Sequence, residues 1–326
     1  MATPVGSGPA VEPGSDAPTA PESDASEPDA PKVILVMLAT GKQGSAVVHA
    51  LARANDPTPA FTILAQTRDP ASAKSRALGA LPNVRLLQGT ADAPAALFAA
   101  AGVPVHGVFS VQQSVDNPGG VAGELVQANA LADAAAQAGV RHFVYASVNF
   151  GGVEGDRTEV PHFESKRLAE LHLRTAHPTL RVTLLRLVTF MDQLVLGAPS
   201  STTTRLTKIM FLTQLKPAVR LQFIAVSDIG RVAARVFADP AHYVGKTVNL
   251  AGDARTPGEL DAGWRAVFGK DKGMRPRMLG GGLLAWAVGF FDEVGFDVDI
   301  LALRAEFPEL KDWETFLRTE VQAAAS

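Results

Sequence analysis

A short apolar run followed by two glycines and a helical pattern most constrains how this chain can fold. Residues 33–52 read VILVMLATGKQGSAVVHALA. The run 33–38 has the length and composition of a strand that is buried on both faces. Gly41 and Gly44 follow, and apolar residues then recur at helical spacing. A strand, a glycine turn and a helix in this order are typical of the first unit of a nucleotide-binding α/β domain.

The glycine turn predicts a site for the pyrophosphate of a dinucleotide. Glycines let the backbone approach a phosphate, and the free N–H groups of a helix N-terminus attract its charge. The usual fingerprint has three glycines, and Leu38 stands where the first would be. A strand–helix turn without a ligand is the alternative interpretation. The residues predicted to contact the cofactor here are Ala39, Thr40, Gly41, Lys42, Gln43 and Gly44.

The end of the next predicted strand, residues 62–67, indicates which dinucleotide is bound. An NAD-binding unit places an Asp or Glu there for the ribose hydroxyls, whereas this chain has Arg68. A guanidinium suits the 2′-phosphate of NADP. Lys74 and Arg76, early in the following helix, could share that phosphate. A surface charge in a loop is the other interpretation of Arg68.

Bulk properties limit the class of protein. The chain has 326 residues, of which 47% are hydrophobic, so it can bury a large core in one domain or in two unequal ones. A net charge of −3 gives no electrostatic footprint for nucleic acid. The absence of cysteine excludes disulfides, cysteine-ligated metals and thiol chemistry. Any redox role must therefore use a bound cofactor.

Residues 1–31 are predicted to be a disordered tail. They are rich in Pro, Ala, Ser, Gly, Asp and Glu, and they lack the apolar centre of a signal peptide. The most apolar later stretch, residues 279–291, is too short and too rich in glycine to span a bilayer, which takes about 20 residues. We therefore expect a cytoplasmic protein that does not enter the membrane.

Strands and helices alternate from residue 32 to about residue 190. This spacing implies right-handed βαβ crossovers and a doubly wound parallel sheet of the Rossmann type. Ligands in such sheets bind beyond the carboxyl ends of the strands. Candidate cofactor neighbours at these ends are Thr90, Ser110 and Gln112, although strand-end Ser and Thr are often only helix caps.

The alternation becomes irregular beyond residue 190. We expect residues 32–190 to form the cofactor-binding domain and residues 191–326 to form a smaller α/β lobe over its cleft. In this lobe, Ser227 or Asp228 is predicted to cap one helix and Thr256 another. The glycine-containing loop at 149–161 is a candidate substrate loop or lid.

Several motifs together give the chain a family resemblance. They are ATGKQGSAVV at 39–48, TRDP at 67–70, DAAAQAGVRHFVYASV at 133–148, HFESKRLAE at 162–170, LLRLVTFMDQL at 184–194, VSDIGRVAARVFADP at 226–240 and FDEVGFDVDILALRAEFPEL at 291–310. Over residues 32–320 the chain resembles the NmrA-like family, atypical members of the short-chain dehydrogenase/reductase superfamily. The resemblance implies a Rossmann domain that binds NADP(H), with a small lobe over the cofactor cleft.

The resemblance also implies roles for single residues. Arg68 matches the family's 2′-phosphate reader, and Lys166 matches its lysine near the nicotinamide ribose. Leu38 departs from the family pattern and could reshape the pyrophosphate contact. Lys42 adds a positive charge that could compensate in part or point to solvent. The pyrophosphate loop of the family is matched by Thr40, Gly41, Gln43 and Gly44.

Catalysis depends on the predicted helix at 162–175. Classical members of the superfamily need a Tyr four residues before the Lys, because the lysine lowers the pKa of the phenol that passes a proton. This chain has His162 there, while Lys166 and the strand-end Ser147 are present. His162, with an ordinary pKa near neutrality, or Lys166 could donate the proton. A helix-start histidine with local hydrogen bonds and an exposed helix lysine are the structural alternatives.

Two functions follow from these residues. The favoured one is an NADP(H)-binding sensor or regulator that signals to a protein partner, as the family's regulators imply and the missing Tyr supports. The alternative is an NADPH-dependent oxidoreductase that reduces a small carbonyl or enone compound. Direct DNA binding has little support from the charge, and no metal site is predicted. Five residues are interpreted as structural: Tyr145, Asp116, Asp192, His106 and His142.

Overall fold

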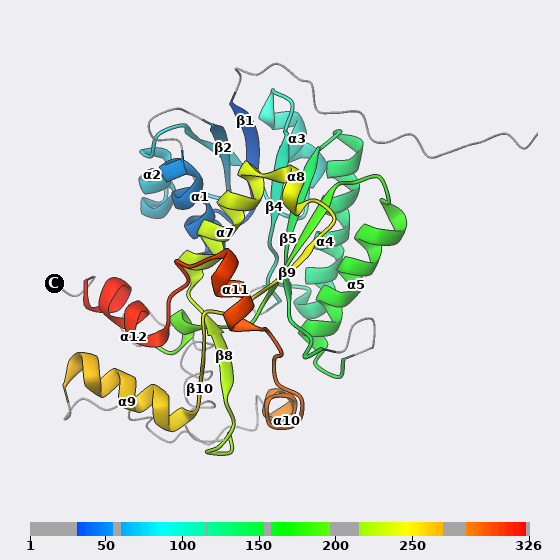
Figure 1. The fold of residues 1–326 in the computed structure, drawn as a ribbon. Coiled ribbons are helices and arrows are strands. Elements are labelled where there is room, and N and C mark those ends of the chain that lie inside the picture. The colour runs from blue at the N-terminus through cyan, green and yellow to red at the C-terminus, as the bar shows by residue number, and fades with distance from the viewer. Residues whose placement is uncertain are drawn as a thin grey trace, which may run out of the picture. The chain divides into compact units, whose positions relative to one another are not determined.

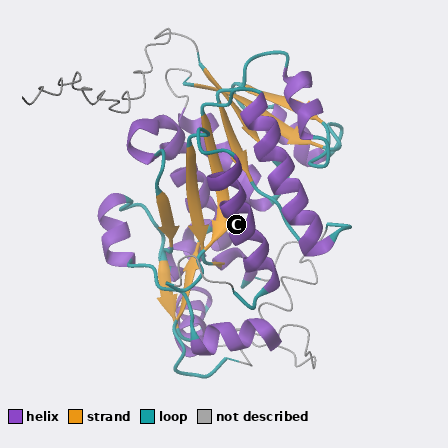
Figure 2. Cartoon of the chain, turned by 90° about the vertical axis from the view of Figure 1, so that its right-hand side faces the viewer, coloured by secondary structure: helices purple, strands orange, loops and turns teal. Residues whose placement is uncertain are grey.

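The chain forms a seven-stranded parallel sheet with helices on both faces (Figure 1, Figure 2). The structure, a computed structural model, describes residues 31–54, 60–114, 117–152, 158–195, 215–269 and 285–323. Every neighbouring pair of strands in this sheet is parallel. In their order across the sheet the strands are β3 (Val84–Gln88), β2 (Phe61–Thr67), β1 (Lys32–Val36), β4 (Gly107–Ser110), β5 (His142–Val148), β6 (Val182–Leu187) and β9 (Thr247–Leu250). The predicted doubly wound α/β fold is confirmed.

The helices on the two faces of the sheet come from different parts of the chain. On one face lie α1 (Lys42–Ala54), α2 (Ala73–Gly79) and α7 (Val226–Ala238) (Figure 1). On the other lie α3 (Pro94–Ala101), α4 (Gly120–Gln137) and α5 (Pro161–Ala176). α7 packs very closely on α1, since a Cβ added at Gly230 would lie 2.4 Å from the carbonyl oxygen of Ala46. The short α8 (Pro240–Tyr243) follows α7.

The central strands are apolar because helices cover both of their faces. In β1, Ile34, Leu35 and Val36 are fully buried, and all seven residues of β5 are buried. The strand order reverses between β1 and β4. In open α/β sheets the crevice at such a reversal, beyond the carboxyl ends of the strands, is where ligands bind. The fold thus places the end of β1 and the end of β4 at this crevice.

A second, three-stranded sheet lies below the first in Figure 1. It consists of β7 (Thr189–Phe190), β8 (Leu221–Ile224) and β10 (Asp253–Arg255), with β7 parallel and β10 antiparallel to β8. Only Val188 separates β6 from β7, so one run of chain enters both sheets. The predicted domain boundary near residue 190 falls at this junction and stays a prediction.

The second sheet has its own apolar core. Leu221, Phe223, Trp313 and Phe316 are among the buried residues that form it. The elements around it include a 3-10 turn (Met191–Gln193), α9 (Pro257–Phe268), α10 (Ala285–Glu293), α11 (Ile300–Glu306), α12 (Trp313–Phe316) and a π-helical stretch (Leu317–Gln322).

One of the two predicted helix caps is correct. Thr256 caps α9 and forms a capping box with Glu259. The predicted cap of α7 is wrong, because α7 begins at Val226 and neither Ser227 nor Asp228 bonds its first turn. The Ser227 hydroxyl instead donates to Glu320, and the Asp228 carboxylate accepts from Lys311. These partners lie more than 80 residues away in the sequence.

Some sequence predictions lie outside the described residues. These are residues 1–30 of the predicted tail, Asp116, residues 153–157 of the candidate loop and residues 279–284 of the apolar stretch. Among the helices that the structure does describe, none has the length and apolarity needed to cross a membrane.

Candidate functional site

The predicted phosphate loop lies between the end of β1 and the start of α1. The backbone N–H of Leu38 donates to Gln66 Oε1 at 2.9 Å, and that of Ala39 donates to the Gln66 carbonyl at 3.1 Å. Gln66 also donates from Nε2 to the Gly89 carbonyl at 2.7 Å, so it connects the loop to β2 and to the end of β3. Sequence reasoning missed this residue. The available signal was an amide inside the otherwise apolar strand Phe61–Thr67.

The loop passes so close to α1 that only glycine fits at position 44. A Cβ on Gly44 would lie 2.3 Å from the carbonyl oxygen of Leu38. Leu38 itself has a φ of 48°, in the left-handed region that costs an L-residue roughly 1–2 kcal/mol. Leu38, which stands where the usual dinucleotide fingerprint has its first glycine, therefore adopts a backbone conformation that glycine favours. The turn keeps its shape at the cost of this strain.

Basic side chains stand at the loop and at the neighbouring helix. Lys42 opens α1 and donates from Nζ to the carbonyl of Asp192 at 3.4 Å. Arg68 follows β2 directly, and Lys74 lies in α2. Within the described residues, the side chains of Arg68 and Lys74 have no ion-pair or hydrogen-bond partner. The guanidinium of Arg76 donates to the Ala71 carbonyl of its own helix start, so Arg68 and Lys74 are the better placed for a phosphate.

The other predicted cofactor neighbours differ in burial. Ser110 and Gln112 are buried at the end of β4, where Gln112 Nε2 donates to Ser110 Oγ at 3.0 Å. Gln112 Oε1 is buried and has no hydrogen-bond partner among the described residues, and the same holds for Gln43 Oε1 in the phosphate loop. Unpaired buried acceptors are rare in folded proteins, and a ligand with O–H or N–H groups would satisfy both. Thr90 is exposed at the end of β3.

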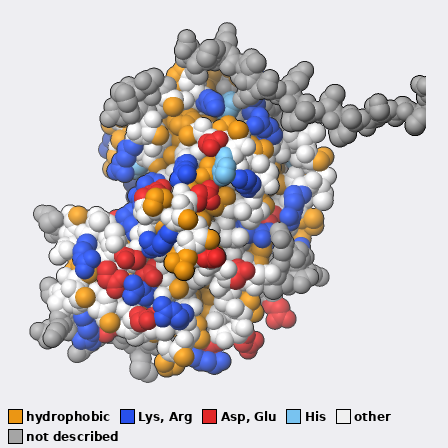
Figure 3. Space-filling view, viewed as in Figure 1, with side chains coloured by type: hydrophobic (Ala, Val, Ile, Leu, Met, Phe, Trp, Pro, Cys, Tyr) orange, Lys and Arg blue, Asp and Glu red, His pale blue; other side chains and the backbone are white. Residues whose placement is uncertain are grey.

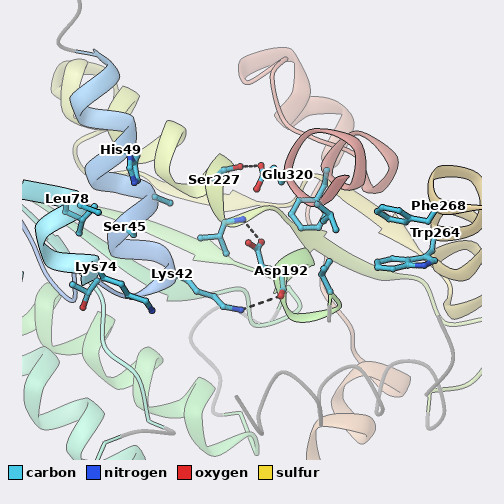
Figure 4. Close-up of a pocket in the computed structure, with 18 residues that line it drawn as sticks. Lys42, Ser45, His49, Lys74, Leu78, Asp192, Ser227, Trp264, Phe268 and Glu320 are labelled. Carbon is cyan, nitrogen blue, oxygen red and sulfur yellow. Dashed lines mark hydrogen bonds between the residues drawn. The ribbon is translucent and has the colours of Figure 1, made fainter. Parts of the chain in front are cut away.

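A cavity of about 880 Å³ opens beside the phosphate loop (Figure 4). Thr40, Lys42 and Lys74 line one side of it, and the two lysine side chains extend into it from neighbouring helices. The opposite side belongs to the C-terminal part of the chain and is aromatic, with Trp264, Phe268 and Phe316. Sequence reasoning missed this wall. Trp264 and Phe268 share α9, and only the packing of α12 brings Phe316 beside them.

Asp192 lies in the same cavity, between the cationic side and the aromatic side (Figure 4). Its Oδ2 accepts the backbone N–H of Val226 at 2.9 Å, at the start of α7. Burial raises the pKa of this carboxyl, although the hydrogen bond from Val226 acts in the opposite direction. The residue interpreted as structural thus also lines the cavity.

The predicted catalytic residues lie on β5 and α5 and do not line this cavity. Lys166 Nζ forms an ion pair with Glu124 Oε1 of α4 at 3.0 Å and donates to the Ala146 carbonyl at 3.3 Å. Ser165 Oγ donates to the other oxygen of Glu124 at 2.9 Å. Nζ also lies 5.7 Å from the centre of the Tyr145 ring. Lys166 is therefore held in place by its neighbours rather than exposed on the helix.

Ser147 belongs to a second buried polar group. Its hydroxyl donates to Glu170 Oε1 of α5 at 2.5 Å. Arg186 of β6 donates to both oxygens of Glu170, at 3.1 Å and 2.6 Å. Glu124 and Glu170 are both almost fully buried, and sequence reasoning missed them. In the sequence, the feature that could have identified Glu124 and Glu170 is that each carboxylate lies on the apolar face of its helix.

His162 lies at the start of α5 with its ring edge-on to Phe163, at a centroid distance of 4.5 Å. Burial and the nearby charge of Lys166 lower the pKa of His162 to about 4. The imidazole is thus neutral at pH 7 and a weak base. Tyr145, interpreted as a core residue, is buried, and within the described part of the chain its hydroxyl has no hydrogen-bond partner. Burial, with the charges of Glu124 and Glu170, raises the Tyr145 pKa.

Comparison with known proteins adds a family and several similar folds. The family described as "NmrA-like family" matches residues 30–273. The structure of NmrA, a negative transcriptional regulator in complex with NAD, is 19% identical with a TM-score of 0.68, covering 89% of this chain and 95% of that one. Citrobacter sp. triphenylmethane reductase complexed with NADP(H) is 19% identical with a TM-score of 0.65, covering 88% and 99%.

A third similar structure is the NADPH-dependent quinone oxidoreductase of Escherichia coli complexed with NADPH. It is 21% identical with a TM-score of 0.64, covering 88% of this chain and 98% of that one. At these identities the likeness shows the fold.

Proposed function

This chain belongs to the NmrA-like family, and on that premise we propose that it binds NADP(H) and acts as a sensor or regulator through a protein partner. The observation that carries the cofactor proposal is the basic group around the phosphate loop. Lys42, Arg68 and Lys74 come from three consecutive elements, and no carboxylate of the described residues neutralises Arg68 or Lys74. A 2′-phosphate is the part of NADP that such a group recognises.

The residues present fit a dinucleotide in two further ways. Gly44 allows α1 to approach the turn, so the N–H groups of its first turn face the crevice where a pyrophosphate binds. The unpaired oxygens of Gln43 and Gln112 offer acceptors to hydroxyl or amide groups. The three similar structures described above were solved with NAD, NADP(H) or NADPH, which supports the same cofactor class here. When bound, NADPH would supply a hydride.

A regulatory role is supported by what surrounds Lys166. The position four residues earlier holds His162, whose low pKa leaves it without a proton to donate at pH 7. The Lys166 ammonium is engaged by Glu124 and by the Ala146 carbonyl. No proton donor with the geometry of the classical Tyr–Lys pair stands among the described residues. The similar structure of a negative transcriptional regulator agrees with this proposal.

A second function, reduction of a small aromatic carbonyl, quinone or enone, is favoured by the cavity beside the loop. Its wall of Trp264, Phe268 and Phe316 suits a flat apolar compound. In this reaction the substrate would take a hydride from NADPH and a proton on its oxygen from Lys166. Since Lys166 does not line this cavity, the reacting oxygen would lie outside it, toward α5. Two of the similar structures are reductases by description, which agrees with this alternative.

Two measurements on the full chain distinguish these functions. Calorimetric titration with NADPH and NADH tests cofactor binding, and we expect tighter binding of NADPH. Absorbance of NADPH with aldehydes, quinones and enones then tests turnover in the wild type and in Lys166→Ala, with the exposed Lys216→Ala as a control. Tight binding without turnover supports the sensor. Turnover that Lys166→Ala abolishes and Lys216→Ala preserves replaces it with the reductase, and absence of NADPH binding overturns both.

A further inference from the structure

Two histidines and an aspartate meet on the α4–α5 layer, apart from the residues assigned to the cofactor. His172 Nε2 and His177 Nε2 each lie 2.6 Å from the same oxygen, Asp133 Oδ1. The potential ligand atoms of the three residues lie within 4.8 Å of one another. The two imidazole rings are 5.4 Å apart between centroids, nearly perpendicular at 77°. Three side chains that can each coordinate a metal ion thus place their ligand atoms close together.

The packing of α4 against α5 produces this arrangement. Asp133 lies in the second half of α4, and His172 lies in the last turns of α5. α5 ends at Ala176, and His177 leaves the helical conformation with φ −129° and ψ 60°. Residues five apart in a continuous helix would diverge by about 140° around its axis. The end of the helix lets His177 turn back toward the aspartate.

The chemistry of these residues suits a transition metal. Two neutral imidazole nitrogens and one carboxylate oxygen are ligands that zinc accepts, and catalytic zinc sites use three protein ligands with water in the fourth position. The side chains are 26% (His172), 19% (His177) and 47% (Asp133) exposed. An ion can therefore enter and keep a water molecule. Tetrahedral ligands at about 2.0–2.1 Å from zinc stand roughly 3.3 Å apart. Each histidine Nε2 would therefore have to lie only slightly farther from Asp133 Oδ1 than its present 2.6 Å.

We propose that Asp133, His172 and His177 form a Zn²⁺ site that joins the end of α5 to α4. His172 lies six residues beyond Lys166, or about 9 Å along the helix. The metal would thus hold α4 and α5 together near their C-termini. The Lys166–Glu124 ion pair, which includes the predicted cofactor lysine, holds them together near their N-termini. The site does not depend on which proposed function is correct.

Zinc binding can be measured on the whole protein after treatment with a chelator. Competition with a chromophoric chelator at pH 7.5 gives affinity and stoichiometry, and Co²⁺ in place of zinc reports the ligand geometry through its visible absorption. We expect one Zn²⁺ per chain and the intense Co²⁺ bands of a four-coordinate site. His172→Gln and His177→Gln should each weaken zinc binding by at least about 100-fold, since both remove a direct ligand.

His242→Gln is the matched control. His242 Nε2 lies 3.5 Å from Glu306 Oε1, so it is also an imidazole beside a carboxylate, but no second histidine joins that pair. Its zinc affinity should equal that of the wild type. Asp133→Asn keeps the size of the side chain and should also lose the Co²⁺ bands, while circular dichroism without metal reports whether each variant is folded. Wild-type protein that binds no zinc, or folded His172→Gln and His177→Gln variants that bind it as tightly as the wild type, would overturn the proposal.

Discussion

Arg68 and Arg76 show how the same residue type takes different roles within nine positions. Arg76 bonds the start of its own helix, whereas the side chain of Arg68 has no partner within the described residues. We expect Arg68→Asp to weaken NADPH binding by about 1–3 kcal/mol, roughly 5- to 150-fold, because it removes a charge-assisted contact. Calorimetry with NADPH measures this, and the affinity for NADH should change little.

Arg76→Asp is the control for this substitution, because it changes the net charge by the same amount. An equal loss of NADPH affinity in the two variants would mean that the net charge of the protein, and not a direct contact with Arg68, determines the affinity. Unchanged affinity in Arg68→Asp would remove Arg68 from the cofactor site.

Gly44 is the position where the phosphate loop tolerates least change. The backbone of Leu38 occupies the space of a Cβ, at 2.3 Å, and backbone cannot rotate away as a side chain can. Gly44→Ala should lower the free energy of unfolding by roughly 1–3 kcal/mol and should weaken NADPH binding, as followed by urea unfolding and calorimetry. Gly258→Ala in α9 is the control. Its nearest atom would lie 3.9 Å away, so stability should stay equal or rise slightly.

The elements around β5 are connected by buried charges rather than by apolar contacts alone. Glu170 of α5 is fully buried and pairs with Arg186 of β6 and with Ser147 of β5. Glu170→Gln leaves the Arg186 charge uncompensated inside the protein. We expect a loss of about 3–5 kcal/mol in the free energy of unfolding, measured with urea.

Glu164→Gln breaks a different ion pair of α5, between Glu164 and Arg167, which lies nearer to the surface. Its expected cost is below about 1 kcal/mol. If both variants lost the same stability, burial of the Glu170 charge would not explain the effect.

Across the whole molecule, acid should destabilise the fold through a histidine far from the cofactor residues. His142 of β5 is 1% exposed, and its Nε2 lies 2.9 Å from the Thr183 hydroxyl. That hydroxyl donates to the Tyr243 carbonyl, so Nε2 is the donor to Thr183. Burial, with the charges of Arg181, His106 and Lys32, lowers the pKa of His142 to about 3.

The sign of the effect follows from the two pKa values. The unfolded chain, with a histidine pKa near 6.5, binds more protons than the folded protein between pH 6.5 and about 3. The contribution of neutral His142 to the free energy of unfolding is complete above pH 6.5 and is lost as the pH falls. Between pH 6.5 and 4 this amounts to about 3 kcal/mol. Urea unfolding over this range should show the loss in the wild type and in His242→Gln. His162, whose pKa is lowered to about 4, adds a similar loss over this range. His142→Gln, which does not titrate, should therefore lack about half of the total loss, and an unchanged slope would contradict the assignment.

What the sequence predicts across the molecule depends on how local the signal is. The strand, glycine turn and helix at 33–52 are consecutive, so their fold and the position of the phosphate loop could be predicted. Gln66, Glu124 and Glu170 carry weaker signals, since each is one polar residue in an apolar pattern. The aromatic side of the cavity and the Asp133 cluster have no signal in spacing. Trp264 and Phe268 share one helix, and the two histidines are five residues apart. Phe316 and Asp133 are tens of residues from them, and only the packing of helices brings each group together.

The arrangement of α7 and β9 sets when the protein can begin to work during its synthesis. α7 lies on α1, the helix that starts at the phosphate loop, and β9 completes the edge of the main sheet beside β6. Both follow residue 225, so a chain that has grown only to residue 195 leaves the apolar side of α1 uncovered. We expect such a shortened chain to bind no NADPH and to require a chaperone to stay dispersed, as light scattering would show. The proposed cofactor binding would therefore develop late in synthesis, after about three quarters of the chain has been made.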